Sequence, residues 1–369
     1  MSSPQPSDGA GDPLATLDHD LRDQADIELL HGLVAIPSLS GGEADAVRYL
    51  TNEMAARGFA TEIDTAGNAI GRIGSGDRHV VLLGHIDTVS GWITPHILGG
   101  ILHGRGAVDA KGPLATFVAA ATRAADQLSC RVTVVGATGE ESLGSPGATE
   151  VATWAAPDLC IIGEPSGWDA VCLGYRGSMT VHYRLTQDGR HTAGPGLGAA
   201  EQAIAFWNDL TGRVDAINAT ATGEGVFTRV TPSIRSFRTE ADGLSESAHL
   251  VMGFRLPPGT DVEGLIEAIR TAAGGAEITV EGYQLGYRSD RRSPLSAPFL
   301  RSIRAEGGTP RFNVKLGTSD MNVVGPAWGC PIVAYGPGDA ALDHTPDEHI
   351  VLDDYLRGVR VLTAVLTSL

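Results

Sequence analysis

The sequence predicts an α/β fold in which a mixed β-sheet flanked by helices carries an inserted α+β module. Short apolar runs alternate with helical patterns in the first half and again after about residue 287, whereas half-exposed strand patterns fill the middle. A chain of 369 residues is also long enough for two domains. We expect a larger domain over residues 13–175 and 287–369, an inserted module over residues 176–286, and a disordered Ser/Pro/Gly/Asp-rich tail over residues 1–12.

The larger domain shows two alternating patterns. Apolar residues at three-to-four spacing predict helices over residues 21–34, 43–57, 114–128 and 353–366. Short apolar runs predict buried strands over residues 80–84, 131–137, 159–163 and 332–335. A polar group follows each of these strands. Because ligands of α/β sheets bind at the carboxyl ends of the strands, we expect a functional site there.

The middle of the chain has a different order of elements. The patterns predict strands over residues 179–185, 225–239, 247–256 and 276–281, with helices over residues 199–210 and 262–273. The order strand, helix, strand, strand, helix, strand is typical of a ferredoxin-like sandwich.

Composition excludes several classes of protein. With 27 basic and 44 acidic residues the net charge is −17, which argues against a nucleic-acid partner. No apolar run is long enough for a membrane helix. The four cysteines form no C-x-x-C pair, so we expect them to be reduced and buried in a cytoplasmic protein, with no cysteine zinc site.

Candidate metal ligands follow the predicted strands. His85 and Asp87 form an H-x-D after the first strand, and the carboxylate could orient the imidazole ring. Asp109 precedes a helix and could instead be its N-cap. Glu140 and Glu141 follow another strand and could instead be a solvated pair.

Two further candidates complete an N/O donor set without thiolates. Glu164 ends a third strand, and His344 follows a fourth. Such a set suits zinc, cobalt or manganese, and two ions sharing one carboxylate would use all its members. The predicted metal ligands are His85, Asp109, Glu141, Glu164 and His344. Glu140, which is not needed as a ligand, is the predicted general base.

The order H-x-D-T, G-R-G-A-x-D-x-K-G, E-E, G-E-P and a late histidine resembles the co-catalytic metallopeptidases. This family includes acetylornithine deacetylase, succinyl-diaminopimelate desuccinylase, aminoacylases and glutamate carboxypeptidase. The resemblance implies a zinc-peptidase-like catalytic domain and a lid module through which two copies form a homodimer. It also implies two divalent ions, zinc or else cobalt, bridged by Asp109, with His85 and Glu164 at one ion and Glu141 and His344 at the other. Gly139 departs from the pattern, because relatives often carry an acidic residue there.

Within the family, residues 315–322 (K-L-G-T-S-D-M-N) and 333–346 resemble hydrolases that release lysine or ornithine from the C-terminal glutamate of an amino-group carrier protein. The resemblance makes Ser319 and Asp320 candidate substrate-binding residues. The carrier is expected to be acidic. Residues 288–315 hold seven basic and two acidic side chains, which could steer such a partner or be a solvated helix face.

The inserted module supplies two more candidates. His191, in G-R-H-T-A-G-P, resembles the histidine that reaches the active site of the partner subunit. Arg255, in F-R-L-P-P-G, resembles the arginine that contacts the carboxylate of the substrate, although a salt bridge within the module is the alternative.

Two other functions stay open from the sequence. One is a deacylase of small substrates such as acetylornithine or succinyl-diaminopimelate. The other is a metal-free binding protein that kept the fold. Lysine and ornithine differ by a single methylene, so the sequence leaves both open as products.

Overall fold

The computed structural model describes residues 13–191, 193–223 and 225–369. The predicted disordered tail, residues 1–12, lies outside the described residues.

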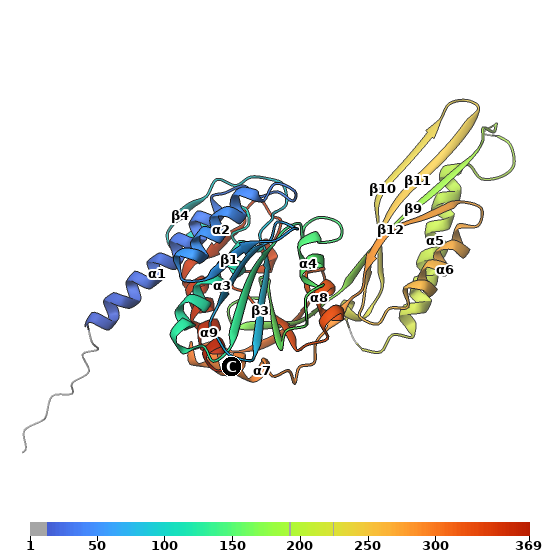
Figure 1. Cartoon of the computed structure of the whole chain (residues 1–369). Coiled ribbons are helices and arrows are strands. Elements are labelled where there is room, and N and C mark those ends of the chain that lie inside the picture. Colours follow the sequence, from blue (N-terminus) through green and yellow to red (C-terminus); the bar gives the residue numbers. More distant parts are fainter. Residues whose placement is uncertain (1–12, 192, 224) are drawn as a thin grey trace, which may run out of the picture.

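A mixed nine-stranded sheet forms the centre of the larger domain (Figure 1). Its strands run in the order β1-β2-β6-β3-β7-β15-β8-β13, and β14 pairs with β8. Strands β6, β3, β7 and β15 are neighbours and parallel, so their carboxyl ends meet at one edge. The strands are β1 (Ala60–Ile63), β2 (Ala69–Ile73), β3 (His79–His85), β6 (Arg131–Ala137), β7 (Leu159–Gly163), β8 (Ala170–Tyr175), β13 (Tyr287–Arg288), β14 (Arg311–Lys315) and β15 (Ile332–Ala334).

Helices cover both faces of this sheet, which explains why its central strands are almost entirely apolar. On β3, Val80 and Leu82 face one helical layer, while Val81 and Leu83 face the other. The first layer contains α1 (Pro13–Val34), α2 (Ala44–Ala56), α3 (Lys111–Ala124), α7 (Ser296–Ala305) and α9 (Leu352–Thr367), and the second contains α4 (Pro146–Val151) and α8 (Met321–Trp328). A small sheet of β4 (His96–Leu98), β5 (Ile101–His103) and β16 (His349–Val351) lies beside them, with single 3-10 turns η1 (Ala125–Gln127) and η3 (Ala340–Leu342).

The smaller module is a four-stranded antiparallel sheet with its own core. Its elements are β9 (Gly177–Asp188), α5 (Ala199–Ala219), η2 (Val226–Thr228), β10 (Thr231–Ala241), β11 (Ser245–Leu256), α6 (Val262–Ala273) and β12 (Glu277–Gln284). The strand order β10-β11-β9-β12 is that of a ferredoxin-like sandwich. Helices α5 and α6 cover one face, and the module projects away from the larger domain (Figure 1).

The predicted fold class is confirmed, with differences at element ends. The predicted strand over residues 225–239 begins only at Thr231, because Gly225 adopts a φ of +88° and a 3-10 turn follows it. The predicted helix over residues 114–128 begins at Lys111 and ends at Ala124, where η1 tightens the backbone. Among the described residues we find no helix with the length and apolar character that crossing a membrane requires.

Two side chains fix the smaller module against the larger domain. The amide Nδ2 of Asn322, on α8, donates to the carbonyl oxygens of Leu285 at 2.7 Å and Arg176 at 3.3 Å, so it holds both connecting segments. The buried guanidinium of Arg176 donates to the carbonyl of Arg255 at 2.9 Å. The near end of the smaller sheet therefore has a fixed position beside the strand ends of the larger one.

Candidate metal centre

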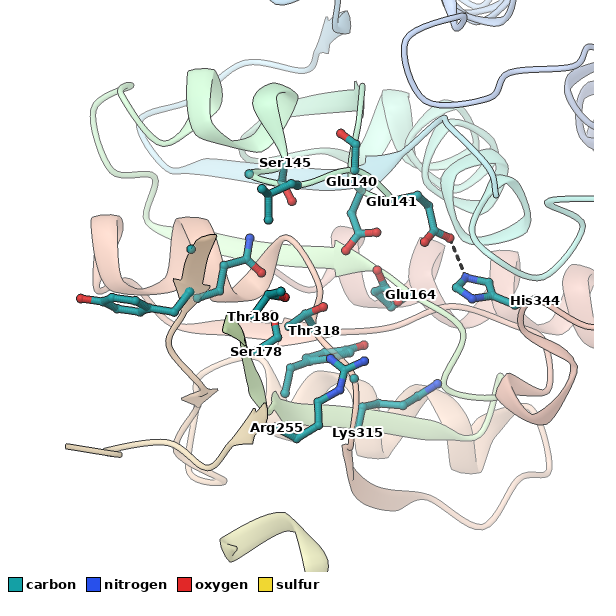
Figure 2. A pocket seen from close by; sticks show the side chains of 18 of the residues that line it. Glu140, Glu141, Ser145, Glu164, Ser178, Thr180, Arg255, Lys315, Thr318 and His344 are labelled. Atoms are coloured by element: carbon teal, nitrogen blue, oxygen red, sulfur yellow. Dashed lines mark hydrogen bonds and ion pairs between the residues drawn. The ribbon is translucent and has the colours of Figure 1, made fainter. Parts of the chain in front are cut away.

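Predicted functional side chains from neighbouring strands converge at one edge of the larger sheet (Figure 2). His85 is the last residue of β3, Glu140 and Glu141 follow β6, and Glu164 follows β7. Since β6, β3 and β7 are adjacent and parallel, these residues meet in space. His344 reaches the same place from the loop before β16.

Asp109 lies between the two histidines. Its Oδ1 is 3.1 Å from Nε2 of His85, and its Oδ2 is 3.0 Å from Nε2 of His344. Burial acts to raise the pKa of Asp109, but the hydrogen bonds from His344 and His85 outweigh it and hold this pKa well below the usual value. The alternative role as a helix N-cap is wrong, because α3 has Ala110 at that position and no side chain caps it.

The cluster has a buried half and an open half. In the buried half, Nε2 of His85 is 4.0 Å from Oε1 of Glu164, and the His85 side chain is only 1% exposed. In the open half, Nε2 of His344 is 2.7 Å from Oε1 of Glu141, and the His344 side chain is 51% exposed. Hydrogen bonds to Asp109 and Glu141 raise the pKa of His344 to about 10. Oδ1 of Asp109 therefore faces the pair of His85 and Glu164, and Oδ2 faces the pair of His344 and Glu141.

Asp87 contacts several residues of this cluster from the protein interior. It is fully buried, its backbone carbonyl oxygen lies 3.0 Å from Nδ1 of His85, and its Oδ1 lies 3.4 Å from the same nitrogen. The same carboxylate accepts the backbone N–H groups of Glu140 and Glu141, each at 3.0 Å, and the hydroxyl of Ser40 at 2.6 Å. Asp87 therefore positions both the His85 ring and the turn that carries the two glutamates, as the H-x-D spacing predicts.

The departure at Gly139 has a steric reason. Its φ is +71°, a conformation that favours glycine. An added Cβ would lie 2.7 Å from Cγ of Pro146. An acidic residue at position 139 would therefore require the turn before Glu140 to move. With glycine there, the predicted ligand Glu141 lies within the cluster.

The donor chemistry fits divalent cations. His85, Asp109 and Glu141 each offer a ligand atom, and these atoms all lie within 4.8 Å of one another. Burial raises the pKa of Glu164 and of Glu140 well above the usual value, and neighbouring carboxylates add to this effect. A buried cluster of this kind favours binding positive charge, and imidazole with carboxylate oxygen is a common zinc donor set.

Glu348 is a buried residue that the sequence motifs did not reveal. Its Oε1 accepts the backbone N–H groups of Val108 at 3.0 Å and Asp109 at 3.1 Å, while its Oε2 pairs with Nη1 of Arg105 at 2.7 Å. Glu348 lies four residues after His344 in the same loop. One carboxylate therefore ties the loop of Asp109 to the loop of His344.

The cluster opens into a cavity of about 450 Å³. The wall opposite the cluster is formed by the end of the smaller sheet that lies nearest the larger domain. There Arg255 on β11 and Gln284 on β12 are both paired with Ser178 on β9. These residues lie on the sheet face that α5 and α6 do not cover. Lys315 and Thr318 of the larger domain complete this wall (Figure 2).

Besides His85 and Asp87, which are buried beneath the cluster, three predicted residues do not line this cavity. Ser319 and Asp320 are each 1% exposed and buried behind it, and the neighbouring Thr318 lines it instead. The prediction that Ser319 and Asp320 contact the substrate is therefore not supported by their positions. His191 is exposed and follows Asp188, which pairs with Ser245 at the far end of the smaller sheet. His191 of the same chain is thus remote from the cavity.

An imidazole and carboxylate cage at the ends of parallel strands, with one further glutamate beside it, is the site of a metal-dependent hydrolase. The chain belongs to the peptidase family M20/M25/M40, whose sequence model matches residues 81–368. As a member of this peptidase family it is a hydrolase of amide bonds with divalent metal ions as cofactors. The predicted family and enzyme class are confirmed.

Curated relatives match nearly the whole chain. A protein of Deinococcus radiodurans named LysW-lysine hydrolase is 44% identical over 94% of this chain and 97% of its own length. A protein of Thermococcus kodakarensis named putative LysW-lysine/LysW-ornithine hydrolase is 38% identical over 93% of this chain and 92% of its own. Solved structures share the fold: the metallo-carboxypeptidase Sso-CP2 of Sulfolobus solfataricus, 19% identical, has a TM-score of 0.76 over 93% of this chain and 98% of its own. A tripeptidase of Staphylococcus aureus, 20% identical, has a TM-score of 0.77 over 94% and 98%.

Proposed function

We propose that this enzyme hydrolyses the amide bond between the C-terminal glutamate of an acidic amino-group carrier protein and lysine or ornithine, in lysine or arginine biosynthesis. The convergence of four N/O donor residues around Asp109, with Glu140 beside them, supports the hydrolysis. The names of the relatives from Deinococcus and Thermococcus support the substrate. The rival function is deacylation of small substrates such as acetylornithine or succinyl-diaminopimelate.

Five residues would hold two divalent ions, with zinc the proposed metal and cobalt the alternative. Asp109 would be shared, His85 and Glu164 would hold one ion, and Glu141 and His344 the other. When bound, such ions polarise a carbonyl group and lower the pKa of water. Asp87 would keep the His85 ring in its orientation through the contact described above.

Glu140 is the proposed general base. It lines the cavity beside the cluster, and burial raises its pKa well above the ordinary value, with Glu164 adding to the effect. A carboxylate held beside the reacting groups can accept a proton in one step and return it in the next. Glu140 would take the proton of the attacking water and deliver it to the amine of the released amino acid.

We further propose that the smaller module, residues 176–286, is a lid and dimerisation domain attached to the catalytic domain of residues 13–175 and 287–369. Strand β10 is a long edge strand whose outer side has no partner among the described residues. Ile234 and Phe237 on this strand are 43% and 42% exposed. An unpaired edge of this kind is suited to pairing with a second copy. In such a homodimer His191 would reach the cavity of the partner subunit and stabilise the charge that develops on the amide oxygen.

The basic stretch of residues 288–315 supports an acidic partner. It is not a single solvated helix face, because only Arg301 and Arg304 of its arginines lie on α7. Arg291 lies over the ring of Phe312 at 4.8 Å, and Arg311 pairs with Asp169 at 2.6 Å. We propose that this surface steers the carrier protein. The unpaired state of all four cysteines fits the cytoplasmic location that we propose.

The test compares substrates on purified enzyme loaded with zinc or cobalt. We expect a higher kcat/KM for lysine or ornithine linked to the carrier than for acetylornithine or succinyl-diaminopimelate. The opposite order would favour the small-substrate deacylase, and failure to bind metal would favour the metal-free binding protein.

Glu140→Gln tests the proposed base. The variant should keep its metal content but lose turnover by about 10²–10⁴-fold, because general acid–base catalysis contributes that much. Glu62→Gln, which removes the charge of a glutamate paired with Arg72 outside the cavity and outside residues 288–315, is the matched control and should retain full turnover. Nearly full activity of Glu140→Gln would contradict the proposed role.

A further inference from the structure

Two cationic side chains in the cavity lack a hydrogen-bond partner. Within residues 13–191, 193–223 and 225–369, neither the guanidinium of Arg255 nor the ammonium of Lys315 donates a hydrogen bond to another group. The carboxylate nearest to Lys315 is Asp343, with Nζ and Oδ2 3.9 Å apart. Elsewhere, buried arginines are paired: Arg105 donates to Glu348, and Arg123 to Asp23 and Asp26. The salt bridge considered for Arg255 from the sequence is thus not formed.

Both cations are partly withdrawn from water. The Lys315 side chain is only 19% exposed, and burial lowers the pKa of Arg255, with Arg235 nearby adding to this effect. A guanidinium group that loses water without gaining a partner raises the free energy of the folded protein, and an ammonium group whose ion-pair partner lies 3.9 Å away is compensated only in part. An anionic group of a ligand would compensate for this loss.

The two cations lie on the same side of the cavity. Arg255 comes from β11 of the smaller module, and Lys315 is the last residue of β14 in the larger domain. In Figure 2 both rise from one wall, with Glu140, Glu141 and Glu164 on the other. A substrate that presents its amide to the glutamate wall would have two cations beneath it.

We propose that Lys315 binds a second carboxylate, on the acyl side of the scissile amide, in a substrate whose released amino acid presents its own carboxylate to Arg255, as the sequence resemblance implies. Lys315 takes the carboxylate on the acyl side and Arg255 the carboxylate of the released amino acid. This inference rests on the proposed function and names its substrate class: amino acids acylated by a group with its own carboxylate, such as glutamyl or succinyl, rather than acetyl.

The path of β14 assigns Lys315 to the acyl side. The strand begins at Arg311, within the basic stretch proposed to face the carrier, and ends at Lys315 in the cavity. A carrier docked on that surface would bring its C-terminal glutamate, the acyl group, along β14. Its second carboxylate would then meet Lys315 first.

Two small substrates isolate this interaction. N-succinyl-lysine and N-succinamoyl-lysine have the same length, but a neutral amide replaces the acyl-side carboxylate in the second. We expect the wild-type enzyme to prefer the succinyl compound by about 10–100-fold in kcat/KM, the range for a hydrogen bond to a charged group. Lys315→Met should abolish this preference, Lys315→Arg should retain most of it, and Arg255→Met should lower kcat/KM for both compounds by the same factor.

The outcomes separate this inference from the function on which it rests. Equal losses on both compounds in Lys315→Met, or no preference in the wild type, would overturn the role of Lys315. Carrier-linked lysine is assayed in parallel. If the wild-type enzyme fails on every substrate, the proposed function fails and this inference with it, whereas wild-type turnover with an intact preference in Lys315→Met contradicts this inference alone.

Discussion

The strand ends of the larger sheet and the smaller module contribute to the cavity in different ways. At the strand ends, Asp87 contacts the imidazole of His85, and Asp109 contacts the imidazoles of His85 and His344. All of these groups belong to the same chain. In the smaller module, Arg255 faces the cavity without a partner, and His191 lies at the far end of the sheet. The larger domain thus builds its half of the site from within the chain. The smaller module provides groups that a substrate or a second copy would complete.

The largest loss of activity should follow from removing Asp109, the central residue of the cluster in the larger domain. Asp109→Ala removes the carboxylate that faces both histidines, so each proposed ion loses a ligand. We expect the purified variant to lose bound metal and turnover to fall by about 10³-fold or more, since metal ions supply several kcal/mol of stabilisation to the transition state. Metal content measured by mass spectrometry and kcat for carrier-linked lysine check this.

The matched control is Asp45→Ala. Asp45 also pairs with a basic side chain of the larger domain, Arg48, but away from the cavity and from residues 288–315. It should keep its metal and its turnover. Full metal content in Asp109→Ala would show that the cluster does not depend on its central residue.

The smaller module should instead depend on a second copy. If His191 acts in the cavity of the partner subunit, His191→Ala and Glu140→Gln dimers should each be nearly inactive. Hybrids of the two would contain one complete site. Random exchange of subunits in a twofold dimer should therefore restore about a quarter of the wild-type activity.

Subunit mixing after mild denaturation, followed by an activity assay, measures this recovery. Native mass spectrometry counts the hybrid dimers, and wild-type protein taken through the same treatment controls for losses of activity. A mixture that contains hybrids but stays inactive, while the treated wild type recovers, would mean that His191 does not act across subunits.

Sequence patterns predicted the two regions unequally well. The strands of residues 131–137 and 159–163 have their predicted ends, because apolar runs that stop at polar groups mark buried strands closely. The same stops located Glu140, Glu141 and Glu164. Neighbours in sequence were a weaker guide, since Ser319 and Asp320 are buried behind Thr318.

Contacts between distant loops could not be predicted from local patterns. Glu348 contacts Arg105 and the backbone of Asp109, more than 200 residues away in sequence, and nothing in the sequence around it distinguishes it from a solvated glutamate. The unpartnered guanidinium of Arg255 and the long ion pair of Lys315 with Asp343 were equally hidden, because a charged residue in a sequence does not show whether it has a partner.

A smaller effect on metal binding should come from Glu348, which holds the loop of Asp109 in place. Glu348→Gln keeps the shape of the side chain but removes the charge that pairs with Arg105. Because side chains that orient metal ligands contribute about 10–100-fold to metal affinity, we expect a loss in that range. Competition with a chelator measures the affinity, and Glu62→Gln is the control. Unchanged affinity would restrict Glu348 to a purely structural role.

The smallest effect should come from the surface where the carrier is proposed to approach. Arg291 and Arg292 are exposed, and Arg291 stacks on Phe312. Changing both to glutamate should lower kcat/KM for carrier-linked lysine by up to about 10-fold at low salt, because steering by charge acts on the encounter rate. The loss should shrink in about 1 M salt, because the Debye length falls from about 10 Å at 0.1 M to about 3 Å at 1 M. Turnover of N-succinyl-lysine should not change, since a small substrate needs no docking surface.

Arg48 and Arg72, which are exposed and ion-paired on the same domain, supply a double variant with the same change in charge. If that control lowers carrier turnover equally, net charge rather than this surface governs the encounter.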